Sequence, residues 1–160
     1  MRALIPLVVS FVAACAAPTP DVVGRASVID GDTLEIHGQR IRLWGVDAPE
    51  GRQSCTDAQG AAWACGRSAA RQLDIRLQDT VVACVREDTD RYGRMVARCR
   101  ADGEDVGAWL VGHGHAVRYA RYDGGAYVSE EAAARREGLG LWAGDFTEPE
   151  TWRREQGRGR

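Results

Sequence analysis

The sequence predicts an α+β fold in which a five-stranded β-barrel is accompanied by about three helices. Short apolar runs bounded by Gly, Asp or Pro indicate the strands, and longer helical patterns follow the third and fifth runs. With 160 residues, the chain is long enough for one domain with a buried core. We find no internal repeat in the sequence and predict no second domain.

The predicted strands alternate with recognisable turn signals. The second and third strands form a hairpin around His37-Gly38, which places Thr33 opposite Arg42. The first strand ends at a turn in which Gly31 can take a positive φ, and Pro49 prevents the third from continuing. The predicted strands cover residues 22–29, 33–36, 39–46, 80–85 and 95–100.

The predicted helices cover residues 58–77 and 105–113, and a third begins at Ser129 as its N-cap and ends before Gly138. Between the last two strands, residues 86–94 read as a polar loop, and residues 148–160 read as a polar, Arg-rich tail with frayed ends. This order of strands and helices is typical of a Greek-key barrel of the OB type, whose strand faces and loops commonly serve oligonucleotides.

Residues 1–17 read as a signal peptide: a short basic start, an apolar run and then small residues. Two exits compete. Ala14-Cys15-Ala16 fits cleavage between small residues, whereas residues 12–15 resemble a lipobox that would leave Cys15 lipidated. We therefore expect an exported protein that is periplasmic, extracellular or anchored to the cell envelope only through lipid on Cys15.

Export predicts that the remaining cysteines form two disulfides, for which three pairings exist. Cys84 and Cys99 fall on neighbouring antiparallel strands, and Cys55 and Cys65 flank one short segment. We therefore predict Cys84–Cys99 and Cys55–Cys65. No spacing matches the C-x-x-C of a zinc or redox site.

The net charge of −2 argues against a protein that holds nucleic acid by its overall field. All 21 basic residues are arginine. Any polyanion must therefore meet a local basic site, where arginine can grip a phosphate or carboxylate with two parallel hydrogen bonds.

Three motifs carry the chemistry: residues 30–33 (D-G-D-T), 42–50 (R-L-W-G-V-D-A-P-E) and 90–94 (D-R-Y-G-R). The predicted topology brings Asp32, Asp47 and Glu50 to one end of the barrel. Converging carboxylates repel one another, which indicates a cation between them. Oxygen donors favour calcium, with magnesium or manganese second. Arg42 and Arg94 would then hold a phosphate and its transition state.

These motifs, together with residues 109–111, Gly114 and residues 138–142, resemble the signature blocks of the thermonuclease (staphylococcal nuclease-like) family. The resemblance covers residues 22–147. It implies a calcium-dependent endonuclease that cuts single- or double-stranded DNA and RNA at the P–O5′ bond and leaves 3′-phosphates. We expect a monomer without an obligate protein partner.

The resemblance also implies a role for each matching residue. Asp32, Asp47 and the carbonyl oxygen of Ala48 would bind one calcium ion. Glu50 would orient or deprotonate the attacking water, with Arg42 and Arg94 on the phosphate. Further substrate contacts are expected from three aromatic side chains: Tyr92, Tyr119 and Tyr122.

Two other interpretations compete with an enzyme. An OB-type module that binds nucleic acid without cutting it would usually lack one of the acids or arginines, but all of them are present here. A calcium-stiffened extracellular domain leaves the two arginines unexplained. We interpret His113 and His115 as a helix-end feature, because no acidic residue accompanies them.

Overall fold

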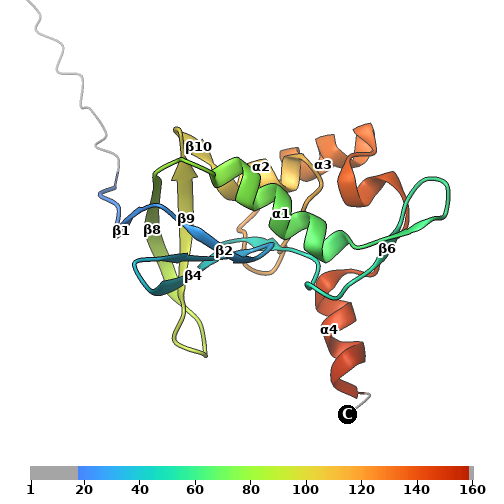
Figure 1. Ribbon diagram of the computed structural model, residues 1–160, viewed down its shortest axis with the longest axis horizontal. Coiled ribbons are helices and arrows are strands. Elements are labelled where there is room, and N and C mark those ends of the chain that lie inside the picture. The colour runs from blue at the N-terminus through green and yellow to red at the C-terminus, as the bar shows by residue number, and fades with distance from the viewer. Residues whose placement is uncertain (1–17, 159–160) are drawn as a thin grey trace, which may run out of the picture.

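A computed structural model describes residues 18–158. The predicted signal peptide and Cys15 lie outside the described residues. Among the described residues, no helix combines the length and apolar character that crossing a bilayer requires. The structure is mixed α+β, with one large sheet and several helices packed around it (Figure 1).

The large sheet contains seven strands in the order β1-β8-β9-β4-β3-β2, with β10 added beside β9. Its two end strands, β1 and β2, do not pair with each other anywhere in residues 18–158, so the sheet is not a closed barrel. The predicted α+β class is confirmed, but the prediction of a five-stranded barrel is wrong in strand number, and the sheet does not close. The strands of this sheet are β1 (Val22–Gly24), β2 (Ser27–Asp30), β3 (Thr33–Ile36), β4 (Gln39–Leu43), β8 (Val82–Thr89), β9 (Met95–Ala101) and β10 (Glu104–Asp105).

The expected first strand is in fact two strands, which lie at opposite ends of the sheet: β1 pairs with β8, and β2 with β3. The chain breaks after Gly24, which packs closely against Ile36 and His37. A Cβ at Gly24 would lie 2.8 Å from Ile36 Cγ2, closer than side chains tolerate. Position 24 therefore leaves no room for a side chain, and the predicted single strand over residues 22–29 is wrong.

The predicted strand over residues 39–46 is also interrupted. Gly45 adopts a left-handed φ of 71°, which ends β4 and starts the short strand β5 (Val46–Asp47). This strand pairs with β11 (Val117–Arg118) in a separate two-stranded sheet, so Asp47 lies opposite Val117. The predicted hairpin register is confirmed, because Thr33 lies opposite Arg42.

The predicted helix over residues 58–77 is too long at its start. Its first turns are replaced by a hairpin of β6 (Cys55–Thr56) and β7 (Ala62–Trp63), and α1 spans only Cys65–Leu77. The Asp57 side chain accepts hydrogen bonds from the backbone N–H groups of Gln59 and Ala61, a turn that competes with helix formation.

The remaining elements follow the prediction more closely. Helix α2 (Val106–Gly112) has Asp105 as its N-cap, and α3 (Val128–Glu137) ends at Gly138 with a φ of 62°. Ser129 is not the N-cap of α3, because Tyr127 holds that position. A 3₁₀ helix, η1 (Gly140–Ala143), follows.

The expected frayed tail is instead a fourth helix, α4 (Pro149–Arg158), so the prediction of about three helices falls one short of those in the described chain. In Figure 1, α4 extends downward from the body of the molecule, in the same direction as the turn between β8 and β9.

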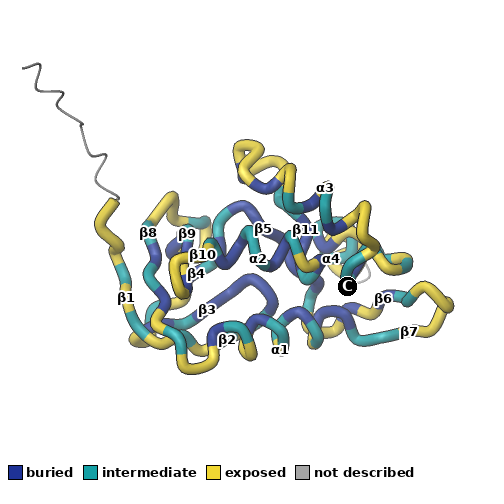
Figure 2. The backbone as a smooth tube through the Cα atoms, turned by 90° about the horizontal axis from the view of Figure 1, so that it is seen from above, coloured by how far each residue is buried: buried dark blue, intermediate teal, exposed yellow. Residues whose placement is uncertain are grey.

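The main core lies between the sheet and the helices α1 and α2, where Leu34, Ile41, Leu73, Met95 and Leu110 are buried. In Figure 2 the buried segments run through the centre of the molecule, and the exposed ones form the turns and the outer helix surfaces. A smaller cluster holds the β6–β7 hairpin against η1 and includes the Cys55–Cys65 disulfide. The structure also contains the disulfide Cys84–Cys99, which joins register partners on β8 and β9.

Candidate active site

The first acid of the site, Asp32, follows a turn in which Asp30 Oδ1 accepts a hydrogen bond from the Asp32 N–H at 3.1 Å. Gly31 does not take the positive φ that the sequence suggests. It is required for space, because a Cβ there would lie 2.6 Å from the Ala48 Cβ and 3.0 Å from the Ala69 Cβ. This close approach brings the Asp32 turn against α1 and against residue 48.

Arg42 joins two buried carboxylates. Its Nη1 donates to Asp32 Oδ1 at 2.8 Å, and its Nη2 donates to Asp47 Oδ1 at 3.0 Å. The side chains of Asp32 and Asp47 are only 6% and 2% exposed, so both acids are largely removed from water. The two carboxylates therefore converge on one guanidinium.

Residue 48 completes this buried corner. The backbone N–H of Ala48 donates to Asp32 Oδ2 at 3.0 Å. Burial raises the pKa of Asp32 to about 7, although the charge of Arg42 and the Ala48 hydrogen bond act in the opposite direction. A buried carboxylate with a raised pKa gains from a nearby cation, since the cation favours its charged form.

The donor set is compatible with a hard cation. Asp32 and Asp47 meet at Arg42 and offer carboxylate oxygens, which calcium prefers over nitrogen or sulfur ligands, and the backbone N–H of Ala48 contacts Asp32. Among residues 18–158, no group of three or more His, Cys, Asp or Glu side chains is arranged to hold a metal by side chains alone. A bound cation would therefore need the backbone carbonyl and water as further ligands.

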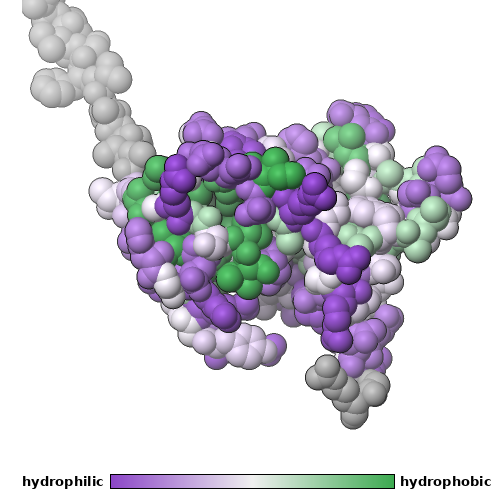
Figure 3. Space-filling view, viewed as in Figure 1, coloured by the Kyte–Doolittle hydropathy of each residue, from purple (hydrophilic) through white to green (hydrophobic). Residues whose placement is uncertain are grey.

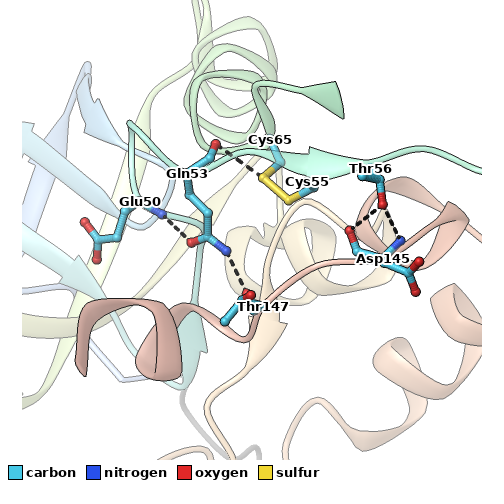
Figure 4. The surroundings of a disulfide bond; sticks show 7 residues. All are labelled: Glu50, Gln53, Cys55, Thr56, Cys65, Asp145 and Thr147. Carbon is cyan, nitrogen blue, oxygen red and sulfur yellow. Dashed lines mark hydrogen bonds between the residues drawn. A yellow bond between two sulfur atoms is a disulfide. The ribbon is translucent and has the colours of Figure 1, made fainter. Parts of the chain in front are cut away.

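Glu50 lies on the turn after Pro49. Its carbonyl oxygen accepts a hydrogen bond from the Gln53 N–H at 2.7 Å, and Gly66 packs against that carbonyl with no room for a side chain. Gln53 is buried, and its Oε1 accepts from the Glu50 N–H at 3.2 Å while its Nε2 donates to the Thr147 carbonyl. Figure 4 shows the Glu50 carboxylate directed away from Gln53 and the disulfide.

Arg94 lines the same cleft and lies just before β9, the strand that pairs in parallel with β4. Its Nε donates to Asp90 Oδ2 at 2.7 Å, which holds it at the base of the β8–β9 turn. Strand β8 continues to Thr89, so the expected polar loop is reduced to a tight turn in which the Gly93 N–H donates to the Asp90 carbonyl. Among the described residues, Arg94 forms its ion pair with Asp90, whereas Glu50 forms its ion pair with Arg153.

The three tyrosines line the same cleft. Tyr92 is 71% exposed, and the Arg91 guanidinium lies 4.9 Å from its ring centre. Tyr119 and Tyr122 pack edge to face with their ring centres 4.8 Å apart. Burial raises the pKa of Tyr119, and the charges of Glu150 and Asp47 act in the same direction. Tyr122 is 55% exposed and accessible to a ligand.

The cleft has a volume of about 780 Å³ and is bounded by β4, the β8–β9 turn and α4. In Figure 3 the outline of the molecule is indented between the β8–β9 hairpin and α4, and hydrophilic residues cover α4. Asp32, Arg42, Ala48, Glu50, Tyr92, Arg94, Tyr119 and Tyr122 all line this cleft. Asp47 does not line the cleft itself, but it accepts a hydrogen bond from Arg42, which does.

Sequence reasoning missed several charged residues of the cleft, among them Arg121, Glu150, Arg153 and Arg154, and of these Arg153 on α4 contacts the predicted acids. Its Nη1 donates to both Asp47 Oδ1 and Glu50 Oε1 at 2.9 Å, and its Nη2 donates to Asp47 Oδ2 at 2.9 Å. Pro149 at the first helical position, with Glu150 in the first turn, was a usable signal for this helix. His113 and His115 pack against Trp109 with tilted rings, and neither histidine lines the cleft.

Comparison with known proteins agrees with these features. Residues 40–144 match the family model described as staphylococcal nuclease homologue. The chain is 46% identical to the succinoglycan biosynthesis protein ExoI of Rhizobium meliloti over 76% of its own length and 64% of that protein, so it spans somewhat less than two thirds of this relative.

Two further relatives carry nuclease names. The chain is 32% identical to an uncharacterized endonuclease of Escherichia coli O157:H7, over 96% of this chain and 98% of that protein. It is 33% identical to the probable staphylococcal-like nuclease CAN1 of Oryza sativa, over 81% of this chain and 37% of that protein. The match of the family model over most of the described residues, with these relatives, shows that the chain belongs to the staphylococcal nuclease homologue family.

Proposed function

We propose that the chain is a calcium-dependent endonuclease that hydrolyses phosphodiester bonds in DNA and RNA. The observation that carries this proposal is the position of Arg42, which joins the buried carboxylates of Asp32 and Asp47 at the wall of an open cleft. Membership of a nuclease family supports the reaction class. The names of the Escherichia coli and Oryza sativa relatives support it too.

The residues of the cleft would have different roles in the reaction. Arg42 on β4 and Arg94 just before the neighbouring strand β9 both line the cleft, so one bound phosphate would be within reach of both guanidinium groups. Guanidinium groups bind phosphate with paired, charge-assisted hydrogen bonds and stabilise the extra negative charge of the transition state. The tyrosines offer faces on which bases can stack regardless of sequence.

Glu50 would accept a proton from the attacking water. The oxygen of that water bonds to phosphorus, the P–O5′ bond breaks, and the departing 5′ oxygen takes up a proton from solvent. The products are a 3′-phosphate and a 5′-hydroxyl. Asp32, Asp47 and the Ala48 carbonyl would hold calcium, which when bound supplies positive charge beside the phosphate.

We also infer that the protein is exported. The two disulfides support this inference, because such bonds persist in oxidising compartments and are rare in the reducing cytosol.

The test is digestion of plasmid DNA and of RNA by the purified chain with added calcium and then with excess chelator. We expect cleavage only with calcium, and 3′-phosphate ends on the products. Cleavage that continues undiminished in chelator would refute the metal requirement. No cleavage of either nucleic acid under any metal condition would favour a binding module that does not cut.

A further inference from the structure

The guanidinium of Arg153 lies against the acids to which the proposed function assigns metal binding and proton transfer. It contacts both oxygens of Asp47 and one oxygen of Glu50, each at 2.9 Å. Asp47 Oδ1 also accepts from Arg42, so every carboxylate oxygen of this buried acid is used by an arginine. Oδ1 accepts two of these hydrogen bonds and Oδ2 one, so a metal ion bound at either oxygen would lie beside the Arg153 guanidinium.

Of the two arginines, Arg153 is the one that can leave. Arg42 comes from the central strand β4, its side chain is 19% exposed, and it also bonds Asp32. The Arg153 side chain is 34% exposed and comes from the terminal helix α4. Displacing Arg153 requires only that one long side chain rotate into the cleft that it already lines.

The position of α4 is nevertheless defined by the fold. Gln53 connects the Glu50 turn to the segment before α4, since it accepts from the Glu50 N–H and its Nε2 donates to the Thr147 carbonyl at 2.6 Å (Figure 4). The Trp152 N–H then donates to the Glu148 carbonyl at the start of the helix. The same buried glutamine thus orders both the acid and the helix that carries its arginine partner.

The negative charge of the nearby acids explains why Arg153 contacts Asp47 and Glu50. Asp32, Asp47 and Glu50 would place three negative charges in one corner, and Arg42 alone balances one of them. Burial acts to lower the pKa of Arg153, but its hydrogen bonds to Asp47 and Glu50 and their charges outweigh burial and raise it. Arg153 thus remains a cation at every pH of interest and acts as an internal counter-ion.

We propose that Arg153 competes with the metal ion for Asp47 and thereby sets the metal affinity of the site. This inference rests on the proposed function, because it takes Asp47 to be a metal ligand. Two cations cannot share one carboxylate edge without strong repulsion. Metal binding therefore includes the cost of releasing Arg153, and removal of the guanidinium should make the metal bind more tightly.

The experiment is calorimetric titration of calcium into the full chain at low ionic strength, with no nucleic acid present. The variants are Arg153→Gln, Arg153→Lys and Arg158→Gln. Arg158→Gln is the matched control, because it removes the same charge from an exposed position on the same helix. Circular dichroism and thermal unfolding without calcium establish that each variant is folded.

We expect Arg153→Gln to bind calcium on the order of ten- to a hundredfold more tightly than the unmodified chain, in line with the contribution of charge-assisted hydrogen bonds. Arg153→Lys should lie between the two, because lysine keeps the charge but loses the paired geometry. It also tests the inference if Arg153→Gln does not fold. Arg158→Gln should stay within about twofold of the unmodified chain, since its charge is remote and screened.

Equal or weaker calcium binding by folded Arg153→Gln would overturn the competition while leaving the proposed metal-dependent activity intact. An equal gain in Arg158→Gln would also overturn it, because the effect would then come from the overall charge of the helix. Absence of calcium binding in every variant would refute the metal requirement of the proposed function together with this inference.

Discussion

Thr33 lies directly opposite Arg42 in the antiparallel pair of β3 and β4. Thr33 is the first residue of β3, so this register places Arg42 next to the preceding residue, Asp32. Arg42 donates a hydrogen bond to Asp32 at 2.8 Å. A shift of one residue would turn Arg42 to the other face of the sheet. The geometry of the candidate site therefore depends on the two-residue turn at His37-Gly38, where both φ angles are positive.

Arg42→Lys should lower turnover on DNA by two or more orders of magnitude. A lysine ammonium cannot reproduce the paired hydrogen bonds by which the guanidinium joins Asp32 and Asp47. Loss of one transition-state donor typically costs about 10²–10³ in rate. The measurement is the initial rate on single-stranded DNA with calcium.

Arg98→Lys is a suitable control for that experiment. Arg98 is also on the sheet and pairs with Glu87, but it does not line the cleft. Its variant should cut at close to the normal rate. A normal rate in folded Arg42→Lys would remove Arg42 from the reaction.

The local part of the fold could be predicted from the sequence, because it depends on neighbouring residues. The β3–β4 register follows from a short turn, and the α2 N-cap follows from Asp105. Asp32, Arg42, Asp47 and Glu50 were likewise found through closely spaced motifs, and the structure brings the first three into direct contact.

Features that depend on distant residues could not be predicted. The contact from Gln53 to Thr147 spans 94 positions, and the contacts from Arg153 span more than 100, so no local pattern reveals them. The close packing of Gly24 against Ile36 and His37 likewise joins residues that only the folded hairpin brings together. Sheet closure was assumed from strand order, whereas pairing across the sheet decides it.

Removing the Cys84–Cys99 disulfide should cost about 3 kcal/mol of stability, because it closes a loop with a sequence separation of 15. The double variant Cys84→Ala with Cys99→Ala avoids placing a hydroxyl in this buried position. Urea unfolding measured by fluorescence gives the difference. Turnover below the transition should remain close to normal, since neither cysteine lines the cleft.

The corresponding double variant, Cys55→Ala with Cys65→Ala, removes the other disulfide. It should lower activity as well as stability. Cys65 Sγ lies 3.4 Å from the carbonyl oxygen of Gln53, the residue that positions Glu50. If both double variants lost turnover equally, the disulfides would contribute only general stability.

His115 should make stability fall as the pH is lowered. Burial, with a further contribution from the charge of His113, lowers the pKa of His115 from its usual value of 6.5 to about 4. The unfolded chain therefore binds a proton at a higher pH than the folded chain does. The stabilising contribution is complete above about pH 6.5 and is lost as the pH falls toward 4.

The measurement is the thermal midpoint of the unmodified chain and of His115→Gln at several pH values between 8 and 4. The gap between the two midpoints should shift in favour of the variant as the pH decreases, because glutamine does not titrate. A gap that is constant with pH would contradict the assignment to His115.

Glu50→Gln should reduce turnover far more than it reduces binding of a nucleotide. The Glu50 carboxylate is 38% exposed at the cleft, and its backbone N–H is held by Gln53, so the amide variant should keep the local fold. A positioned base or water-orienting group contributes roughly 10²–10⁴ in rate. Neutralising a carboxylate beside a bound phosphate removes repulsion, so affinity should stay unchanged or rise slightly.

Two measurements separate these effects: turnover on single-stranded DNA, and the dissociation constant of a 3′,5′-bisphosphate nucleotide with calcium at fixed salt. Glu50→Gln also weakens the partner of Arg153, so the double variant with Arg153→Gln serves as the control. Because both lack the Glu50 carboxylate, we expect the single and double variants to be similarly slow. Affinity that fell together with turnover would instead make Glu50 a residue that maintains the metal site, and the water-activating role would be lost.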